Sequence, residues 1–401
     1  MPRTTRRFAV PITLGLAGAL ALTGCGSDKA KTPAAGGTTT TASSGSGGVK
    51  CSGLSLGFFG ALTGDSANLG INERNGASLA IKKFNAANKD CQIKLEEFDS
   101  QGDPAQAPAL ATKAVGNAAL VGIVGPAFSG ESKQANPIFD EAGLPIVTAS
   151  ATNPALSTNG WKIFHRAVGN DNAQGPAAAQ YITGTLKAKK VSVVDDGSEY
   201  GKGIADIVRK KVVSNGATDV ADDTIDVKAT DYSATVTKVK GAAPDVVFFG
   251  GYYQQAGLLA KQLKDQGVNA TFVGGDGSND KGFIEAAGTA ADGAVFTAPA
   301  APIDKVPGGA AFKDEYKAEF KQDIGLYSVE AFDAANCILD AISHGKTTRK
   351  DINDYLNSTL NFKGLSKTYK FDDKGELAGD VAMYPYVVTK GELVGAAQIT
   401  F

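Results

Sequence analysis

The sequence contains few histidines, methionines and tryptophans, and this scarcity narrows the functions to consider. Only two histidines, two methionines and one tryptophan occur among its 401 residues. Because the histidines are isolated and no pair of cysteines has metal-ligand spacing, we expect no metal site. The formal net charge of −2 lacks the basic excess that nucleic-acid binding requires, so we expect no nucleic-acid partner.

Motifs of catalysis and cofactor binding are missing as well. The glycines around Ser129, Ser150 and Ser198 do not have the spacing of a nucleophile elbow. No phosphate-loop lysine motif occurs, and residues 275–280 lack the third glycine of a dinucleotide fingerprint. A serine–histidine–acid set is conceivable on paper, but His165 lies in an apolar, strand-like stretch that favours a structural role. We therefore expect a protein that is not an enzyme and holds no cofactor.

Long apolar runs are also absent, except for one near the N-terminus. Three arginines precede the apolar residues 8–22, and small residues follow. The run has about 15 residues, whereas a membrane-spanning helix needs about 20. A charged start, a short apolar run and small residues before a cut are the parts of a secretory signal peptide, which we predict over residues 1–24. The protein is therefore expected outside the cytoplasm.

The signal peptide ends at a cysteine. Residues 22–25 read Leu-Thr-Gly-Cys and resemble the lipobox of bacterial lipoproteins, which implies that Cys25 is acylated and anchors the chain to the membrane. The alternative is an ordinary signal peptide with a chance cysteine. Residues 25–50 are rich in glycine, serine, threonine and alanine and have no aromatic residue, so they cannot bury enough surface to become ordered. We predict a flexible tether with a reach of about 25–30 Å.

The remaining three cysteines can be assigned from their positions. Cys51 precedes the apolar run 54–59, and Cys91 precedes the run 93–98. If both runs are neighbouring parallel strands, the two cysteines lie at the same end of the sheet, within disulfide range, and an exported protein meets an oxidising compartment. We predict this disulfide. Cys337 lies in a helical pattern and is expected to be a small buried apolar residue.

From Cys51 onward, short apolar runs alternate with helical patterns, which is typical of α/β domains with parallel sheets. The predicted strands are 54–59, 93–98, 120–124, 145–147, 191–194, 245–249 and 271–273. They form two successive series, at about 51–167 and 171–297. Helical patterns follow at 312–320 and 327–342, and strand-like pieces at 368–371, 381–388 and 393–399. The sequence leaves open to which domain the last pieces return.

Polar segments follow several predicted strands, where ligands bind in open α/β sheets. In the first series they offer small hydroxyls, and Ser129 is placed to open a helix, which suits an anion. In the second series they offer Asp276 with Tyr200 and Tyr252, which suits a cation. Together they suit a zwitterion such as an amino acid. The alternative is that these residues serve only turns and helix caps.

At this point the chain resembles a known family. Five segments carry the resemblance in order: 125–156, Gln174-Gly175-Pro176, Tyr200-Gly201-Lys202-Gly203, Gly250-Gly251-Tyr252 and Gly274-Gly275-Asp276-Gly277. They resemble the leucine/isoleucine/valine-binding proteins, which are the substrate-binding lipoproteins of branched-chain amino-acid ABC transporters. The resemblance implies the type I periplasmic-binding-protein fold, with two doubly wound parallel-sheet lobes joined by three crossovers. The implied lobes are 51–170 with 300–377, and 171–299 with 378–401.

The resemblance also implies roles for individual residues. The ligand carboxylate is expected at Ser129, Ser150 and Thr152, the ammonium at Asp276, and aromatic contacts at Tyr200, Tyr252 and Tyr327. Three positions depart from a well-studied member of the family. Asp276 replaces a glutamate, Leu69 replaces an aromatic residue, and Phe128 replaces a cysteine beside the pocket, so that member's disulfide is absent here.

The expected function follows from these assignments. The resemblance implies a protein, expected to be a monomer, that captures leucine, isoleucine, valine or an analogue and delivers it to an ABC permease. The alternative keeps the fold but binds an amide or another small carboxylate, for uptake or sensing. Leu69 and Asp276 are the two residues that keep this alternative open.

Overall fold

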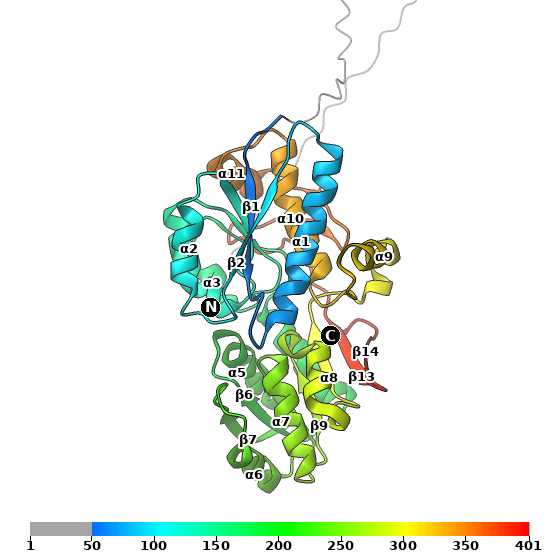
Figure 1. Ribbon diagram of the computed structural model, residues 1–401. Coiled ribbons are helices and arrows are strands. Elements are labelled where there is room, and N and C mark those ends of the chain that lie inside the picture. The colour runs from blue at the N-terminus through cyan, green and yellow to red at the C-terminus, as the bar shows by residue number, and fades with distance from the viewer. Residues whose placement is uncertain (1–49, 401) are drawn as a thin grey trace, which may run out of the picture. The chain divides into compact units, whose positions relative to one another are not determined.

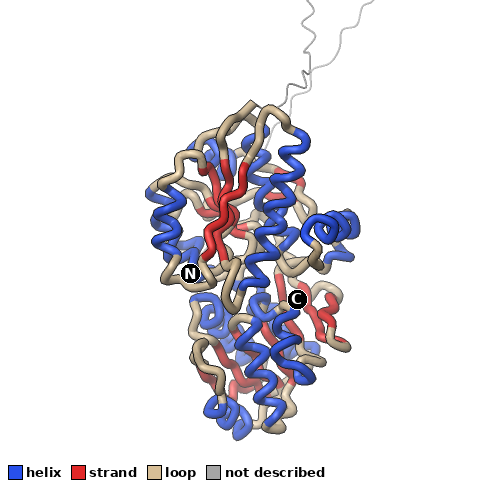
Figure 2. The backbone as a smooth tube through the Cα atoms, viewed as in Figure 1, coloured by secondary structure: helices blue, strands red, loops and turns tan. Residues whose placement is uncertain are grey.

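The computed structural model describes residues 50–400. The predicted signal peptide, Cys25 and the predicted tether up to residue 49 therefore lie outside the described residues. Two large sheets, each with helices packed on it, account for most of the described chain (Figures 1 and 2). Between residues 50 and 400, no helix is both long enough and apolar enough to cross a membrane.

Five parallel strands form the sheet of the first lobe, in the order β2–β1–β3–β4–β5. They are β1 (Ser55–Gly60), β2 (Lys94–Asp99), β3 (Leu120–Val124), β4 (Ile146–Thr148) and β5 (Phe164–Arg166). All residues of β1, β3, β4 and β5 are buried, as expected for a parallel sheet covered on both faces. The first four strands confirm the predicted apolar runs to within one residue at each end.

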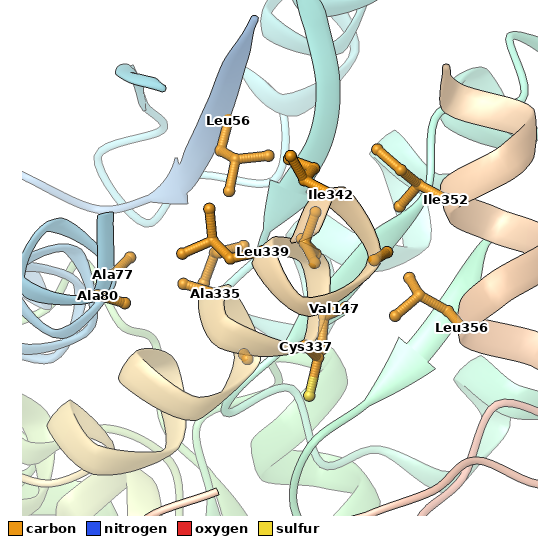
Figure 3. Close-up of a cluster of buried hydrophobic side chains, with 14 of the residues drawn as sticks. Leu56, Ala77, Ala80, Val147, Ala335, Cys337, Leu339, Ile342, Ile352 and Leu356 are labelled. Carbon is orange, nitrogen blue, oxygen red and sulfur yellow. The ribbon is translucent and has the colours of Figure 1, made fainter. Parts of the chain in front are cut away.

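Helices cover both faces of this sheet. On one face lie α1 (Ala67–Ala87), α10 (Ser328–Ser343) and α11 (Arg349–Ser358), and on the other α2 (Ala107–Val115) and α3 (Ser129–Glu141). The side chains between the sheet and the first group of helices form a buried apolar cluster, which Figure 3 shows. In it Leu56 and Val147 of the sheet pack with alanines of α1 and with Leu339 of α10. Cys337 is buried in the same cluster, as predicted. The first lobe therefore needs residues that follow the second lobe in the sequence.

Seven strands form the sheet of the second lobe, in the order β14–β13–β10–β9–β8–β6–β7. They are β6 (Lys190–Asp195), β7 (Thr218–Thr224), β8 (Val246–Gly250), β9 (Thr271–Gly274), β10 (Val295–Ala298), β13 (Tyr384–Thr389) and β14 (Glu392–Gly395). The first five run parallel, but β13 pairs antiparallel with both β10 and β14. The predicted parallel-sheet lobe is confirmed for these five strands, and a two-stranded antiparallel hairpin extends its edge.

The second lobe has its own helices. They are α4 (Asp171–Gln180), which continues as a π-helical turn (Tyr181–Thr185), α5 (Glu199–Ser214), α6 (Ser233–Ala242), α7 (Tyr253–Asp265) and α8 (Lys281–Ala287). Figure 1 shows α7 and α8 side by side. The sequence did not predict β7, because its residues Thr-Asp-Val-Ala-Asp-Asp-Thr are mostly polar and it lies at the edge of the sheet. It also did not predict the short strand β10.

The chain passes between the two lobes three times. It leaves the first sheet after β5, returns after β10, and leaves again before β13. The returning segment contains α9 (Gly309–Phe320), which packs on α1, and the small hairpin of β11 (Phe362–Lys363) and β12 (Thr368–Tyr369). Both late strands, β13 and β14, join the second sheet. This settles where the last strand-like pieces return.

A disulfide joins the start of the described chain to the first sheet. Cys51 and Cys91 are bonded to each other, with their Cα atoms 4.5 Å apart. They precede β1 and β2, which are neighbouring parallel strands with Ser55 opposite Lys94. The two cysteines therefore lie at the same end of the sheet, and the predicted disulfide is confirmed.

Candidate ligand-binding site

A cavity lies between the two lobes, at the ends of their strands. The empty space among its side chains is about 280 Å³, open solvent at its mouth included. Its lining residues come from both lobes: Leu69, Glu73, Ala127, Phe128, Ser129, Ser150, Tyr200, Tyr252, Asp276, Gly277 and Tyr327. Side chains of both lobes can therefore contact one small molecule in this cavity.

The segments that follow the strands supply most of this lining. Residues 127–129 follow β3 and Ser150 follows β4 in the first lobe. In the second lobe, Tyr252 follows β8 and Asp276 follows β9. The carboxyl ends of parallel strands meet at one edge of each sheet, and these two edges face the cavity.

The first-lobe wall supplies hydrogen-bond donors. Helix α3 begins at Ser129, so the free N–H groups of its first turn lie at the cavity. The Ser129 hydroxyl accepts a hydrogen bond from the Asn153 N–H at 3.2 Å and keeps its own proton to donate. The Ser150 hydroxyl donates to the Ala127 carbonyl at 2.5 Å. A helix N-terminus with a serine hydroxyl suits a carboxylate.

The second-lobe wall supplies a carboxylate, and aromatic rings of both lobes surround it, Tyr200 and Tyr252 from the second lobe and Phe128 and Tyr327 from the first. The Tyr200 hydroxyl donates to Asp276 Oδ1 at 2.8 Å, and the Tyr327 hydroxyl donates to Asp276 Oδ2 at 2.7 Å. Burial raises the pKa of Asp276, and these two hydrogen bonds oppose the rise. The rings of Tyr200 and Tyr252 are 5.4 Å apart, and that of Phe128 is 5.2 Å from Tyr252. A carboxylate and aromatic faces together suit an ammonium group.

Gly277 is the one glycine of the cavity lining, and its place allows no side chain. A Cβ atom there would lie 2.7 Å from the Tyr200 ring and 3.0 Å from the Gly251 carbonyl oxygen. The Gly277 N–H also donates to the Tyr200 hydroxyl oxygen at 3.2 Å. The Gly-Asp-Gly sequence thus holds the Asp276 carboxylate and the Tyr200 hydroxyl close together.

The structure brings eight of the nine predicted ligand-binding residues to this cavity. They are Leu69, Phe128, Ser129, Ser150, Tyr200, Tyr252, Asp276 and Tyr327. Thr152 is not part of the lining. It is fully buried, and its hydroxyl lies near the carboxyl of Asp171, another buried acid. The role of Thr152 in binding a carboxylate stays a prediction.

Sequence reasoning missed Glu73, Ala127 and Gly277. Glu73 follows Leu69 by four residues in α1, so both lie on one face of that helix. This spacing was a usable signal once Leu69 had been placed at the site. Burial is the largest cause that raises the pKa of Glu73 well above its usual value. The lining contains two acids, Glu73 and Asp276, and no lysine, arginine or histidine.

Direct contacts between the lobes lie near the cavity. The Asn68 side-chain amide donates to Asp280 Oδ1 at 2.8 Å, and the Asn153 amide donates to the Glu199 carbonyl at 2.6 Å. Lys133 pairs with the Glu199 carboxylate at 2.8 Å, with about half of the lysine side chain exposed. These contacts join residues of the first lobe to residues of the second, so they exist only while the lobes are close together.

Known proteins with similar sequences extend over most of the chain. The model of the periplasmic binding protein family matches residues 53–392. The leucine-, isoleucine-, valine-, threonine- and alanine-binding protein of Pseudomonas aeruginosa is 31% identical over 337 residues, which cover 83% of this chain and 90% of that protein. The leucine-specific-binding protein of Salmonella typhimurium is 31% identical over 333 residues, 81% of this chain and 88% of that protein.

Solved structures show a similar arrangement. A leucine-binding protein from Thermotoga maritima superposes with a TM-score of 0.80 at 25% identity, over 86% of this chain and 99% of that chain. A branched-chain amino acid transporter substrate-binding protein from Streptococcus pneumoniae, in complex with isoleucine, gives a TM-score of 0.78 at 28% identity over the same shares. The fold of this chain is therefore that of the two-lobed type I binding proteins.

Proposed function

Because this chain belongs to the periplasmic binding protein family, we propose that it captures a branched-chain L-amino acid in the cavity between its lobes and delivers it to an ABC permease. The observation that carries this proposal is the division of the cavity into two polar walls. Donors around Ser129 lie on one wall, and the buried carboxylate of Asp276 lies on the other. An α-amino acid presents the matching pair of opposite charges.

Each part of the ligand has a proposed partner. Its carboxylate lies at Ser129 and the start of α3, with Ser150 and Thr152 nearby, and its ammonium lies at Asp276. The aliphatic side chain lies among apolar lining residues: Leu69, Phe128, Tyr252 and Tyr327. Charge-assisted hydrogen bonds contribute about 1.5–3 kcal/mol each and burial of the side chain about 1.5–3 kcal/mol, which brings micromolar affinity, about −8 kcal/mol, within range.

Binding is proposed to shift the protein from an open to a closed arrangement. A ligand held by both walls interacts fully with both only when the lobes are close together, so its binding favours closure. The lobes that move are residues 51–170 with 300–377, and residues 171–299 with 378–401. Contacts such as those of Asn68 and Asn153 then form between the lobes and stabilise the closed state.

The remaining parts of the proposal concern the cellular setting. We propose that residues 1–24 direct export, that Cys25 carries the lipid that anchors the protein, and that the protein works as a monomer outside the cytoplasm. The chain is proposed to bind its ligand without chemical change, since its relatives are binding proteins. Mass spectrometry of the native N-terminus tests the lipid, and mass analysis of ligand recovered after binding tests for turnover.

Calorimetry on residues 51–401 tests the ligand class. The protein is unfolded and refolded to remove any bound ligand, and a panel of L-amino acids is titrated. We expect leucine, isoleucine or valine to bind at least tenfold more tightly than phenylalanine, glutamate and lysine. A folded protein that binds none of the three would contradict the proposal.

One observation favours the alternative ligand class. Both carboxylate oxygens of Asp276 already accept hydrogen bonds, from Tyr200 and Tyr327. These two bonds give the carboxylate partners even when the ligand, such as an amide or another small carboxylate, brings no ammonium group. The same calorimetric panel, extended with aliphatic amides and short carboxylic acids, distinguishes the two classes.

A further inference from the structure

We propose that Glu73 is a ligand-binding residue, and that it acts as a neutral carboxylic acid whose proton is donated to the ligand carboxylate. The inference rests on the proposed function, because it assumes a zwitterionic ligand with its carboxylate on the first-lobe wall. It adds a residue that was not expected at the site, and it assigns that residue a protonation state.

The position of Glu73 places its carboxyl group at the carboxylate end of the cavity. Glu73 lines the cavity one helical turn after Leu69, and only 1% of the residue is exposed. Its carboxyl lies near the Ser150 hydroxyl, which also lines the cavity. Its Oε2 atom is buried and has no hydrogen-bond partner within residues 50–400. A buried, unpartnered polar atom at a binding cavity is costly unless a ligand or a proton satisfies it.

Beside the N–H groups that open α3, the side chains of Ser129 and Ser150 supply a single free proton to the first-lobe wall. Ser150 uses its proton on the Ala127 carbonyl, so in this arrangement it cannot also donate to a ligand. Ser129 keeps its proton, because its oxygen accepts from Asn153. A carboxylate has two oxygens to satisfy. A protonated Glu73 has one O–H to donate, whereas an ionised Glu73 only accepts.

The charge balance of the cavity leads to the same protonation state. Glu73 and Asp276 are the acids of the lining, and the lining has no basic residue. The ligand ammonium neutralises Asp276. The ligand carboxylate and Glu73 then share the first-lobe wall, and two neighbouring buried carboxylates without a cation cannot both ionise.

Three acids on neighbouring elements lie near Glu73, whose cavity also contains Tyr200, Tyr252 and Tyr327. The acids are Glu131 on α3, Glu330 on α10 and Asp276 after β9, and each raises the pKa of Glu73 in addition to burial. The nearby Ser150 hydroxyl lowers this pKa by less than burial raises it. The pKa of Glu73 is therefore already high in the free protein, so the side chain stays neutral at pH values where an ordinary glutamate is ionised. A bound carboxylate raises this pKa further.

Two substitutions at Glu73 separate a neutral donor from an anion. Titration of stripped protein with L-leucine near neutral pH is expected to show that Glu73→Met weakens binding at least tenfold. Glu73→Gln is expected to restore most of this loss, because its amide N–H donates in place of the acid proton. Glu141→Met, which removes an exposed carboxylate at the end of α3, serves as the matched control and is expected to bind as the wild type does. Thermal unfolding checks that each variant is folded.

The alkaline limb of the pH profile supplies a second measurement, which does not need the methionine variant. The affinity of the wild type for leucine is expected to fall as the pH rises through the pKa of Glu73, by up to tenfold per pH unit. Residue 73 of Glu73→Gln cannot ionise, so its profile is expected to lack this step and to keep the titrations that both proteins share, those of Glu131 and of the leucine ammonium group. The difference between the two profiles reports Glu73.

Three results would overturn the inference. Unchanged affinity in folded Glu73→Met would remove Glu73 from the site. Equal weakening in Glu73→Gln and Glu73→Met would show that the site needs an anion, and identical alkaline profiles would show that no proton on Glu73 is involved. In each case wild-type binding of leucine, isoleucine or valine keeps the proposed function intact. A wild type that binds none of them overturns the proposed function, and this inference with it.

Discussion

The two walls of the cavity provide for opposite charges by different means. On the first-lobe wall, several groups share the task, among them the N–H groups that open α3 and the Ser129 hydroxyl. On the second-lobe wall, one side chain carries the charge, because Asp276 is the acid that the second lobe contributes to the lining. A dispersed set of dipoles tolerates the loss of one member better than a single charge does. The comparison therefore predicts unequal effects of substitution on the two walls.

Removal of the Asp276 carboxylate is expected to have the largest effect. In Asp276→Ala the ligand ammonium becomes a buried charge without its partner, which costs about 3 kcal/mol or more, a loss of affinity of about a hundredfold. Calorimetry with leucine measures the loss, and thermal unfolding of the ligand-free variant shows whether the fold survives. A loss below tenfold in a folded variant would mean that the ammonium is held elsewhere.

Removal of the Ser129 hydroxyl is expected to cost less. Ser129→Ala deletes one charge-assisted hydrogen bond of about 1.5 kcal/mol but leaves the backbone donors of α3 in place. The expected loss is about tenfold. Affinities measured side by side with Asp276→Ala test the comparison directly, since a larger loss at Ser129 would reverse the predicted order of the two walls.

Truncation of Leu69 is expected to change selectivity more than overall affinity. Leu69→Ala removes part of the apolar lining, so leucine is expected to lose about 1 kcal/mol of burial, or about fivefold. Alanine, whose methyl side chain is short, is expected to lose little. The leucine-to-alanine affinity ratio is the measurement, and an unchanged ratio would place the ligand side chain away from Leu69.

The contacts between the lobes are expected to give the smallest effects, and these do not depend on the ligand. Asn68→Ala deletes the hydrogen bond to Asp280, worth about 0.5–1.5 kcal/mol to the closed state, so every ligand is expected to bind about threefold more weakly. Lys133→Ala removes a half-exposed ion pair and is expected to weaken binding about twofold, near the lower end of the about 0.2–1 kcal/mol that such pairs contribute. A ligand-dependent loss in Asn68→Ala would mean that Asn68 touches the ligand.

Local sequence was enough to find the strands of the first sheet up to β4, three buried strands of the second sheet, and the segments that carry most of the site. The run 120–124 is apolar throughout because both faces of β3 are buried, and a run of this kind reveals a strand without knowledge of its neighbours. Ser129 and Asp276 could be found because they follow such strands, where ligands bind in open sheets. The aromatic residues and Leu69 were placed by resemblance to a family rather than by any local pattern.

Long-range packing decided the rest. The pattern of β7 is polar because an edge strand is only half buried, and the pairing of β13 with β10 joins residues that lie about ninety positions apart. In the local sequence, Glu73 is an ordinary acidic residue of a helix. It lies at the cavity only because α1 packs near Ser150 and the second lobe. Burial and the charges of neighbours set the protonation of such a group, and both depend on residues that are distant in the sequence and close only in the folded chain.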